Sequence, residues 1–208
     1  MWSEANGWVI NEDTHTNGTT IYYKFDNNDN NLTQTYKDYT SAGASRWSGT
    51  VTISESSSAT GVVKTYYWQD GVIASFGYPK TDSSGHLTSW EIRMNRFYTV
   101  SNSVMAHEFG HVVGLKDLYN PNNWGKLMYG YDSGPAGSPT TTDKIGANVI
   151  TGVHSSHTWK HTYTGLDIFN RRYHTRSCTV CDGIGRMNGV IWTELCSVAM
   201  GKCMVCSG

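Results

Sequence analysis

The chain has 208 residues, a formal net charge of −1, and charged residues make up only 16% of it. Charged residues make up about 25% of a typical soluble protein, and a nearly neutral chain is poorly suited to capturing nucleic acid or an anionic membrane by charge. No apolar run approaches the roughly 20 residues that a membrane-spanning helix needs. We therefore expect no nucleic-acid partner and no membrane span.

Charge and cysteine are distributed unevenly along the chain. Residues 1–150 have a net charge of −4, whereas residues 151–208 have a net charge of +3 and contain every cysteine. We expect a cysteine-free domain over residues 1–150 and a small Cys/His-rich domain over residues 151–208. The second domain is too short to bury much core, so it needs metal or disulfides to stabilise it.

Local sequence patterns predict a mixture of strands and helices in the first domain. Alternating apolar residues predict strands over 19–25, 51–55, 62–68, 73–76 and 86–95. Helical spacing predicts helices over 36–47, 100–115 and 142–150. Ser101 or Ser103 is available to cap the second helix, and Thr140-x-x-Asp143 is a capping box for the third. The predicted fold class is α+β, with a mixed sheet and one long helix in the middle of the domain.

The segment His107-Glu108-Phe109-Gly110-His111 matches the pattern H-E-x-x-H. Residues four apart share one face of a helix, so His107 and His111 can bind one metal ion. Imidazole nitrogen is a good zinc ligand, and zinc lowers the pKa of a bound water toward about 7. Glu108 lies beside the first ligand and can take a proton from that water as general base. The competing interpretation is an ordinary amphipathic helix whose two histidines are satisfied within the core.

The residues after His111 strengthen the metal-site interpretation. Gly114 can end the helix with a left-handed turn, after which the chain doubles back and brings Asp117 near the two histidines. A carboxylate oxygen is a legitimate third zinc ligand, which leaves the fourth position open for water or substrate. The alternative is that Asp117 is a loop residue that caps the next turn.

The stretch from His107 to Asp117 resembles the extended zinc signature of the metzincin metalloproteases. An aspartate as third ligand is similar to the snapalysin group, the small neutral metalloproteases of Streptomyces. Leu127-Met128-Tyr129-Gly130 resembles the Met-turn, in which the methionine lies under the zinc site without binding it. Several metzincins have a tyrosine two residues after that methionine, but this chain has Gly130 there. The resemblance covers about residues 19–150 and implies a mixed twisted sheet, an active-site helix and a closing helix.

The resemblance also implies how substrate binds and where the protein acts. Residues 88–94 stand where this group has its edge strand, so we expect Trp90 and Ile92 to contact an extended peptide by backbone pairing. The implied activity is that of a zinc endopeptidase with a protein or peptide substrate, and we expect a monomer. We expect it to be secreted, its signal peptide removed or omitted from this sequence.

Two Cys-x-x-Cys pairs occur in the second domain. Cys178 and Cys181 form the first pair and Cys203 and Cys206 the second, a spacing that resembles a zinc ribbon. A second, structural zinc ion bound by these four thiolates is one interpretation. Disulfides, which suit a secreted protein, and free thiols are the alternatives.

Two other functions are compatible with parts of the sequence. One is a catalytically silent peptide-binding module that zinc only stabilises, against which the presence of Glu108 and the open fourth ligand position argue. The other is a metal-dependent hydrolase of a non-peptide bond, against which the strand suited to backbone pairing argues. A zinc endopeptidase agrees with all of these features.

Overall fold

The computed structural model describes residues 4–11, 13–131 and 136–153, together with the backbone of five short strands between residues 159 and 203. Contacts between Cα atoms divide the chain into one part over Trp2–His154 and another that comprises Met1 and Ser155–Gly208. In the described part of the chain, the helices are too short or too polar to cross a bilayer.

The first part is built on a five-stranded mixed sheet, in the order β2-β1-β3-β5-β4. The strands are β1 (Thr20–Phe25), β2 (Thr52–Glu55), β3 (Gly61–Tyr66), β4 (Ala74–Thr81) and β5 (Leu87–Asn95). Neighbouring strands are parallel except for β4, which is antiparallel to β5 and forms one edge. Among its described residues, three α-helices and two short 3-10 helices, η1 (Glu4–Asn6) and η2 (Pro121–Asn123), accompany the sheet, so the fold is α+β with a mixed sheet, as predicted.

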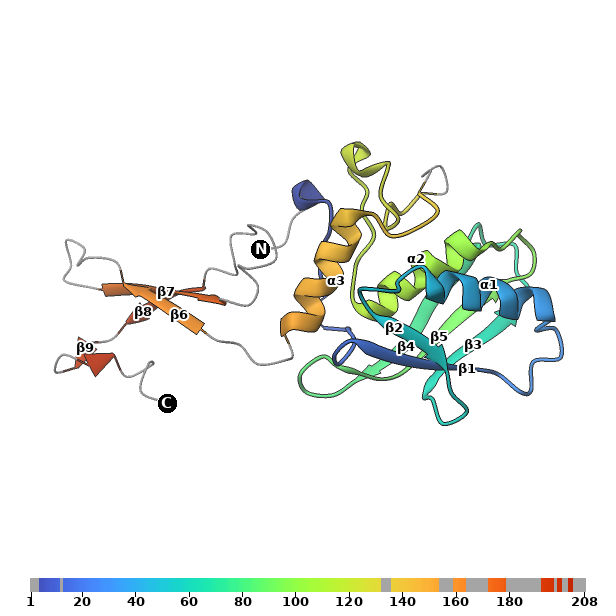
Figure 1. The fold of residues 1–208 in the computed structure, drawn as a ribbon, viewed down its shortest axis with the longest axis horizontal. Helices are drawn as coiled ribbons and strands as arrows, with labels where there is room; N and C mark the ends of the chain where they lie inside the picture. Colours follow the sequence, from blue (N-terminus) through green and yellow to red (C-terminus); the bar gives the residue numbers. More distant parts are fainter. Residues whose placement is uncertain are drawn as a thin grey trace. The chain divides into compact units, whose positions relative to one another are not determined.

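Two helices, α1 (Gln34–Ser45) and α2 (Asn102–Val113), lie side by side over one face of this sheet (Figure 1). They approach closely at Gly43, where a Cβ atom would lie 2.6 Å from Cβ of Met105. The indole of Trp47 is fully buried and donates a hydrogen bond to the carbonyl of Ala106 at 2.8 Å. These contacts fix α2 against α1.

The closing helix α3 (Thr141–Val153) begins at the predicted capping box. Asp143 accepts a hydrogen bond from the backbone N–H of Thr140 at 2.7 Å, and the Thr140 hydroxyl accepts one from the N–H of Asp143 at 3.4 Å. The helix continues to Val153, which is beyond the domain boundary predicted at residue 151.

The prediction that residues 88–94 form the edge strand is wrong. Strand β5 pairs with β3 on one side and with β4 on the other, so its backbone groups are already hydrogen-bonded. Trp90 and Ile92 are buried, with 5% and 0% of their surface exposed, and the Trp90 ring packs over Gly61 beneath the helices. These two residues belong to the core, and the edge strand on this side of the sheet is β4, with β2 at the opposite edge.

The described residues of the second part form two small antiparallel sheets. One consists of β6 (Trp159–Tyr163), β7 (Arg172–Cys178) and β8 (Trp192–Cys196), and the other of β9 (Val198–Ala199) and β10 (Lys202–Cys203). Cys181 and Cys206 lie outside the described residues, as do the side chains of Cys178 and Cys203. A structural zinc ion at these cysteines stays a prediction.

Candidate metal centre

The helix α2 presents His107, Glu108 and His111 within two turns. It begins after Ser101, whose hydroxyl accepts a hydrogen bond from the N–H of Val104, and it ends at Gly114 with φ of 118° and ψ of 21°. This left-handed conformation is one that glycine adopts without a steric penalty. The predicted glycine turn is therefore confirmed, although α2 is shorter than the predicted range 100–115, and the turn leads the chain back toward the two histidines.

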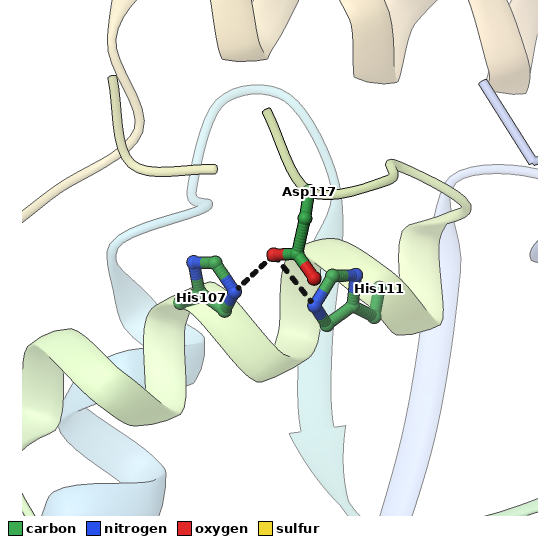
Figure 2. Close-up of side chains that lie close together, drawn as sticks. All are labelled: His107, His111 and Asp117. Atoms are coloured by element: carbon green, nitrogen blue, oxygen red, sulfur yellow. Dashed lines mark ion pairs between the residues drawn. The ribbon is translucent and has the colours of Figure 1, made fainter. Parts of the chain in front are cut away.

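Asp117 arrives beside both histidines, as Figure 2 shows. Its Oδ1 atom lies 3.0 Å from Nε2 of His107 and 3.5 Å from Nε2 of His111. The three candidate ligand atoms lie within 4.8 Å of one another. Ligand atoms about 2.0–2.2 Å from a tetrahedral zinc ion are roughly 3.3–3.5 Å apart, so these separations are close to those that zinc requires.

The other nitrogen of each imidazole is engaged by a backbone carbonyl. Nδ1 of His107 lies 2.7 Å from the carbonyl oxygen of Leu127, and Nδ1 of His111 lies 2.8 Å from that of Leu115. A carbonyl oxygen only accepts, so each Nδ1 must carry the proton and donate it. In the neutral imidazoles the Nε2 lone pairs then face the Asp117 oxygen, which is the arrangement that orients histidines for metal binding.

The charges of the three side chains are strongly coupled. Burial lowers the pKa of His107, but the hydrogen bond to Asp117 and the nearby Glu108 charge outweigh it and raise that pKa to about 9. Burial raises the pKa of Asp117, but its contacts with His107 and His111 hold that pKa well below its usual range. A positive charge is therefore strongly favoured between these groups, either as a proton on His107 or as a metal ion.

The donor set fits a zinc ion. Oδ1 of Asp117 is buried and has no hydrogen-bond partner among the described residues apart from the two facing imidazole nitrogens. Two imidazole nitrogens and one carboxylate oxygen are a known catalytic zinc set that leaves a fourth position open. Without a proton or a metal ion between them, the lone pairs of the two Nε2 atoms would face those of Asp117 Oδ1 at 3.0 Å and 3.5 Å.

Glu108 lies in the same cleft but makes no ion pair with the candidate ligands in the described structure. The residue is 5% exposed, and its Oε2 atom is buried without a hydrogen-bond partner. A buried carboxylate oxygen without a donor is costly unless substrate or water satisfies it. Substrate or water in the cleft can supply that donor.

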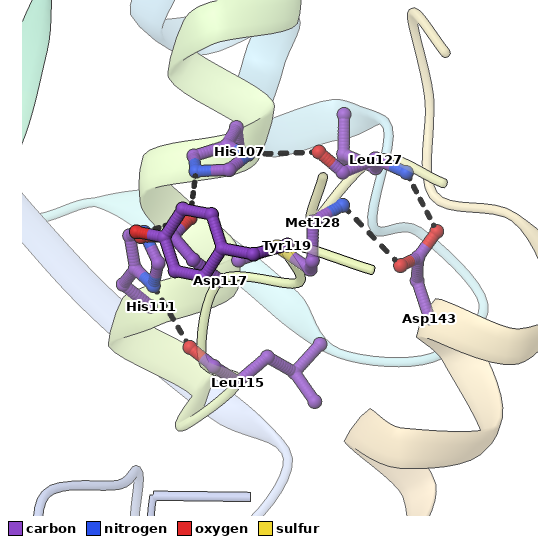
Figure 3. A network of polar contacts seen from close by, with 8 residues as sticks. All are labelled: His107, His111, Leu115, Asp117, Tyr119, Leu127, Met128 and Asp143. Carbon is purple, nitrogen blue, oxygen red and sulfur yellow. Dashed lines mark hydrogen bonds and ion pairs between the residues drawn. The ribbon is translucent and has the colours of Figure 1, made fainter. Parts of the chain in front are cut away.

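Met128 lies directly under α2. It is fully buried, and a Cβ atom added to Gly110 would overlap with its sulfur. The carboxylate of Asp143 accepts hydrogen bonds from the backbone N–H groups of Leu127 at 3.1 Å and of Met128 at 3.4 Å, as Figure 3 shows. The segment that resembles a Met-turn is thus fixed to α3 on one side and to His107 on the other.

Sequence reasoning missed Tyr119, which lies two residues after Asp117. Its hydroxyl donates a hydrogen bond to Oδ2 of Asp117 at 3.2 Å, and the charge of that carboxylate raises the pKa of Tyr119. A Cβ atom at Gly130 would lie 2.6 Å from Cε1 of this ring. Gly130, noted in the sequence as a departure from several metzincins, leaves room for this ring, but nothing in the sequence pointed to Tyr119.

The three candidate ligands and Glu108 line a cleft of about 600 Å³. Its lining includes residues 71–76, which lead into β4 and form its start, together with residues 126–127 and 129–131. The free edge of β4 therefore borders the cleft, and the Phe76 ring lies 6.3 Å from the ring of His111. An extended peptide could pair with this edge and pass over the histidines.

Comparison with known proteins identifies the family of the chain. Residues 18–151 match the model of the Streptomyces extracellular neutral proteinase (M7) family. No curated protein sequence matches the chain. Among solved structures, a chain of the GM1-bound form of the ECX AB5 holotoxin has a similar fold, with a TM-score of 0.51 and 16% identity. That alignment covers 72% of this chain and 90% of the other chain, and it concerns the fold alone.

The family match spans the sheet, α1, α2, Asp117, Met128 and most of α3, and it confirms the resemblance seen in the sequence. The chain belongs to the Streptomyces extracellular neutral proteinase family of metallopeptidases.

Proposed function

We propose that the protein is a secreted zinc endopeptidase of the metzincin type, with His107, His111 and Asp117 as the zinc ligands. The observation that carries this proposal is the convergence of both Nε2 atoms on one Asp117 oxygen, while each Nδ1 is held by a carbonyl. Family membership supports the same activity and an extracellular location. A bound zinc ion would supply Lewis acidity, polarising a carbonyl and making water more acidic.

Residues of the chain would bind the substrate, transfer the proton and orient the two histidines. The free edge of β4 would hold substrate by backbone hydrogen bonds, which places the scissile peptide along the cleft over α2. Glu108 would accept a proton from the attacking water through its unpartnered Oε2 and then donate it to the leaving amine. The carbonyls of Leu127 and Leu115 would keep both histidines in the orientation and tautomer required.

Residues 151–208 are proposed to form a domain separate from the catalytic groups. We infer that they form a small Cys/His-rich domain that is not needed for the chemistry, because every proposed catalytic group lies between His107 and Met128. Cys178, Cys181, Cys203 and Cys206 would bind a structural zinc ion. Total zinc of two ions per chain, with one lost after alkylation of these cysteines, would support that assignment, whereas disulfide-linked cysteines would contradict it.

The experiment that tests the proposed activity is digestion of an unfolded protein by the purified chain. We expect cleavage by the zinc-loaded protein, loss of cleavage after removal of zinc by a chelator, and recovery when one equivalent of zinc is returned. A zinc-loaded protein that binds peptides along the cleft but cleaves none would instead favour the catalytically silent binding module.

A further inference from the structure

An N-terminal strap, defined as residues 4–11 and 13–16, lies along the loop that carries Asp117. Ile10 pairs with Leu115 in an isolated antiparallel bridge. The N–H of Asn11 donates to the carbonyl of Gly114 at 2.7 Å, and the N–H of Lys116 donates to the carbonyl of Val9 at 2.8 Å. The strap precedes residues 18–151, so it lies outside the segment that the family model matches. This chain therefore supports its ligand loop with residues beyond the family segment.

The strap is fixed to the core on its other side. Trp8 is fully buried, and a Cβ atom at Gly146 in α3 would lie 2.9 Å from Cβ of Trp8. Close packing of this kind requires the glycine and leaves the strap little freedom to move. The strap is thus fixed against α3, and it can restrict the movement of the residues that it contacts.

Glu4, at the start of the strap, binds the chain just after the ligand. Its Oε2 atom accepts hydrogen bonds from the backbone N–H of Tyr119 at 2.9 Å and from that of Asn120. Its own carbonyl accepts a hydrogen bond from the side-chain amide of Asn123 at 3.0 Å. Hydrogen bonds to a carboxylate are among the stronger ones in proteins, so Glu4 fixes the backbone at Tyr119.

Tyr119 connects Glu4 to the metal centre, because the Tyr119 hydroxyl donates a hydrogen bond to Oδ2 of Asp117 at 3.2 Å. We propose that Glu4 is a positioning residue for the metal ligand Asp117 and acts through Tyr119. The inference rests on the proposed function in taking Asp117 as a zinc ligand. Glu4 itself contacts neither the ligand atoms nor the cleft, so its effect is transmitted by the loop.

The test measures how fast zinc is lost to a chromophoric chelator, well below the melting temperature of each variant. We expect Glu4→Ala to release zinc about 3–10-fold faster than the wild type, a smaller effect than the roughly 10–100-fold that follows loss of a residue in direct contact with a metal ligand, because Glu4 acts through Tyr119. Glu4→Gln should remain close to the wild type, because its amide oxygen can still accept both N–H groups. Glu55→Ala, at an exposed glutamate on the opposite edge strand β2, is the matched control and should leave the rate of zinc release unchanged.

A double-mutant cycle separates a positioning role from general stabilisation. In a Tyr119→Phe background the hydrogen bond to Asp117 is gone, so we expect Glu4→Ala to accelerate zinc release by less than twofold further. If Glu4→Ala lowers the melting temperature but releases zinc at the wild-type rate, the proposal is overturned. If that variant does not fold, Glu4→Asp replaces it in the test and should also release zinc faster than the wild type. This substitution keeps the charge but shortens the side chain by one methylene, which moves the carboxylate away from the backbone of Tyr119. Zinc release is measured without substrate, so this test stands even if the protein cleaves nothing.

Discussion

Asp143 accepts a hydrogen bond from the backbone N–H of Leu127 at 3.1 Å, and the carbonyl of Leu127 in turn accepts one from Nδ1 of His107 at 2.7 Å. Asp143 has no exposed surface, and it also accepts hydrogen bonds from the backbone N–H and the hydroxyl of Thr140. One carboxylate therefore begins α3, holds the Met128 segment and supports the orientation of a proposed zinc ligand.

We expect Asp143→Asn to lower the free energy of unfolding by about 3 kcal/mol. The substitution replaces one acceptor oxygen by an NH2 group that faces N–H donors, and it removes the charge that strengthens the remaining bonds. Chemical denaturation with urea measures this loss. Asp13→Asn, at an exposed aspartate, is the control and should change the free energy of unfolding by less than about 0.5 kcal/mol. Equal stabilities of the two variants would show that Asp143 does not have this role.

Met128 and Gly110 fill one small space under α2, which predicts that their mutations are not additive. Met128→Ala leaves a cavity and should cost about 2–5 kcal/mol, whereas Gly110→Ala overpacks the site and should cost about 1–3 kcal/mol. The added methyl group occupies part of the space that Met128 leaves, so the double variant should be more stable than Met128→Ala alone. Thermal unfolding of the four proteins checks this, and strictly additive losses would mean that the two residues do not share a space.

The raised pKa of His107 predicts that zinc competes with a proton. Because this pKa is about 9 in the metal-free protein, His107 is protonated at neutral pH and must lose that proton to bind zinc. The apparent zinc affinity should therefore rise about 100-fold from pH 6 to pH 8, which is tenfold per unit for one displaced proton. Competition with a chelator of known pH dependence measures the affinity. A flat profile across this range would show that His107 is already neutral.

The same shift affects the stability of the metal-free protein. A histidine whose folded pKa lies above its unfolded value of 6.5 stabilises the fold fully below pH 6.5, and this contribution is lost as the pH rises through about 9. The metal-free wild type should therefore lose stability between pH 6.5 and pH 9, and His107→Gln should lose less over that interval. Melting temperatures of both proteins across this range provide the measurement, and parallel profiles would contradict the assignment.

The sequence predicted the features that depend on local chemistry. Gly114 ends α2 because the left-handed turn favours glycine, and the Thr140–Asp143 capping box begins α3 because its hydrogen bonds join residues three apart. The positions of most strands also followed from alternation within a few residues. Each of these features is decided within one short stretch of chain.

The features that the sequence did not predict depend on contacts between distant segments. Strand order is one, because nothing local shows that β4 rather than β5 has the free edge. The role of Glu4 is another, since it binds the backbone of Tyr119 and Asn120 across more than one hundred residues. The Tyr119 ring over Gly130 is a third, and only the folded chain brings the two together.

In the proposed enzyme, Glu108 serves the zinc-centred hydrolysis of peptide bonds without helping to bind the metal. The most direct test is the rate of protein cleavage by Glu108→Gln, compared with the wild type at equal zinc content per chain. The substitution keeps size and burial but removes the proton acceptor, so we expect cleavage to fall at least about 1000-fold while zinc binding is unchanged. Cleavage by fully zinc-loaded Glu108→Gln at a rate near that of the wild type would show that Glu108 is not the general base.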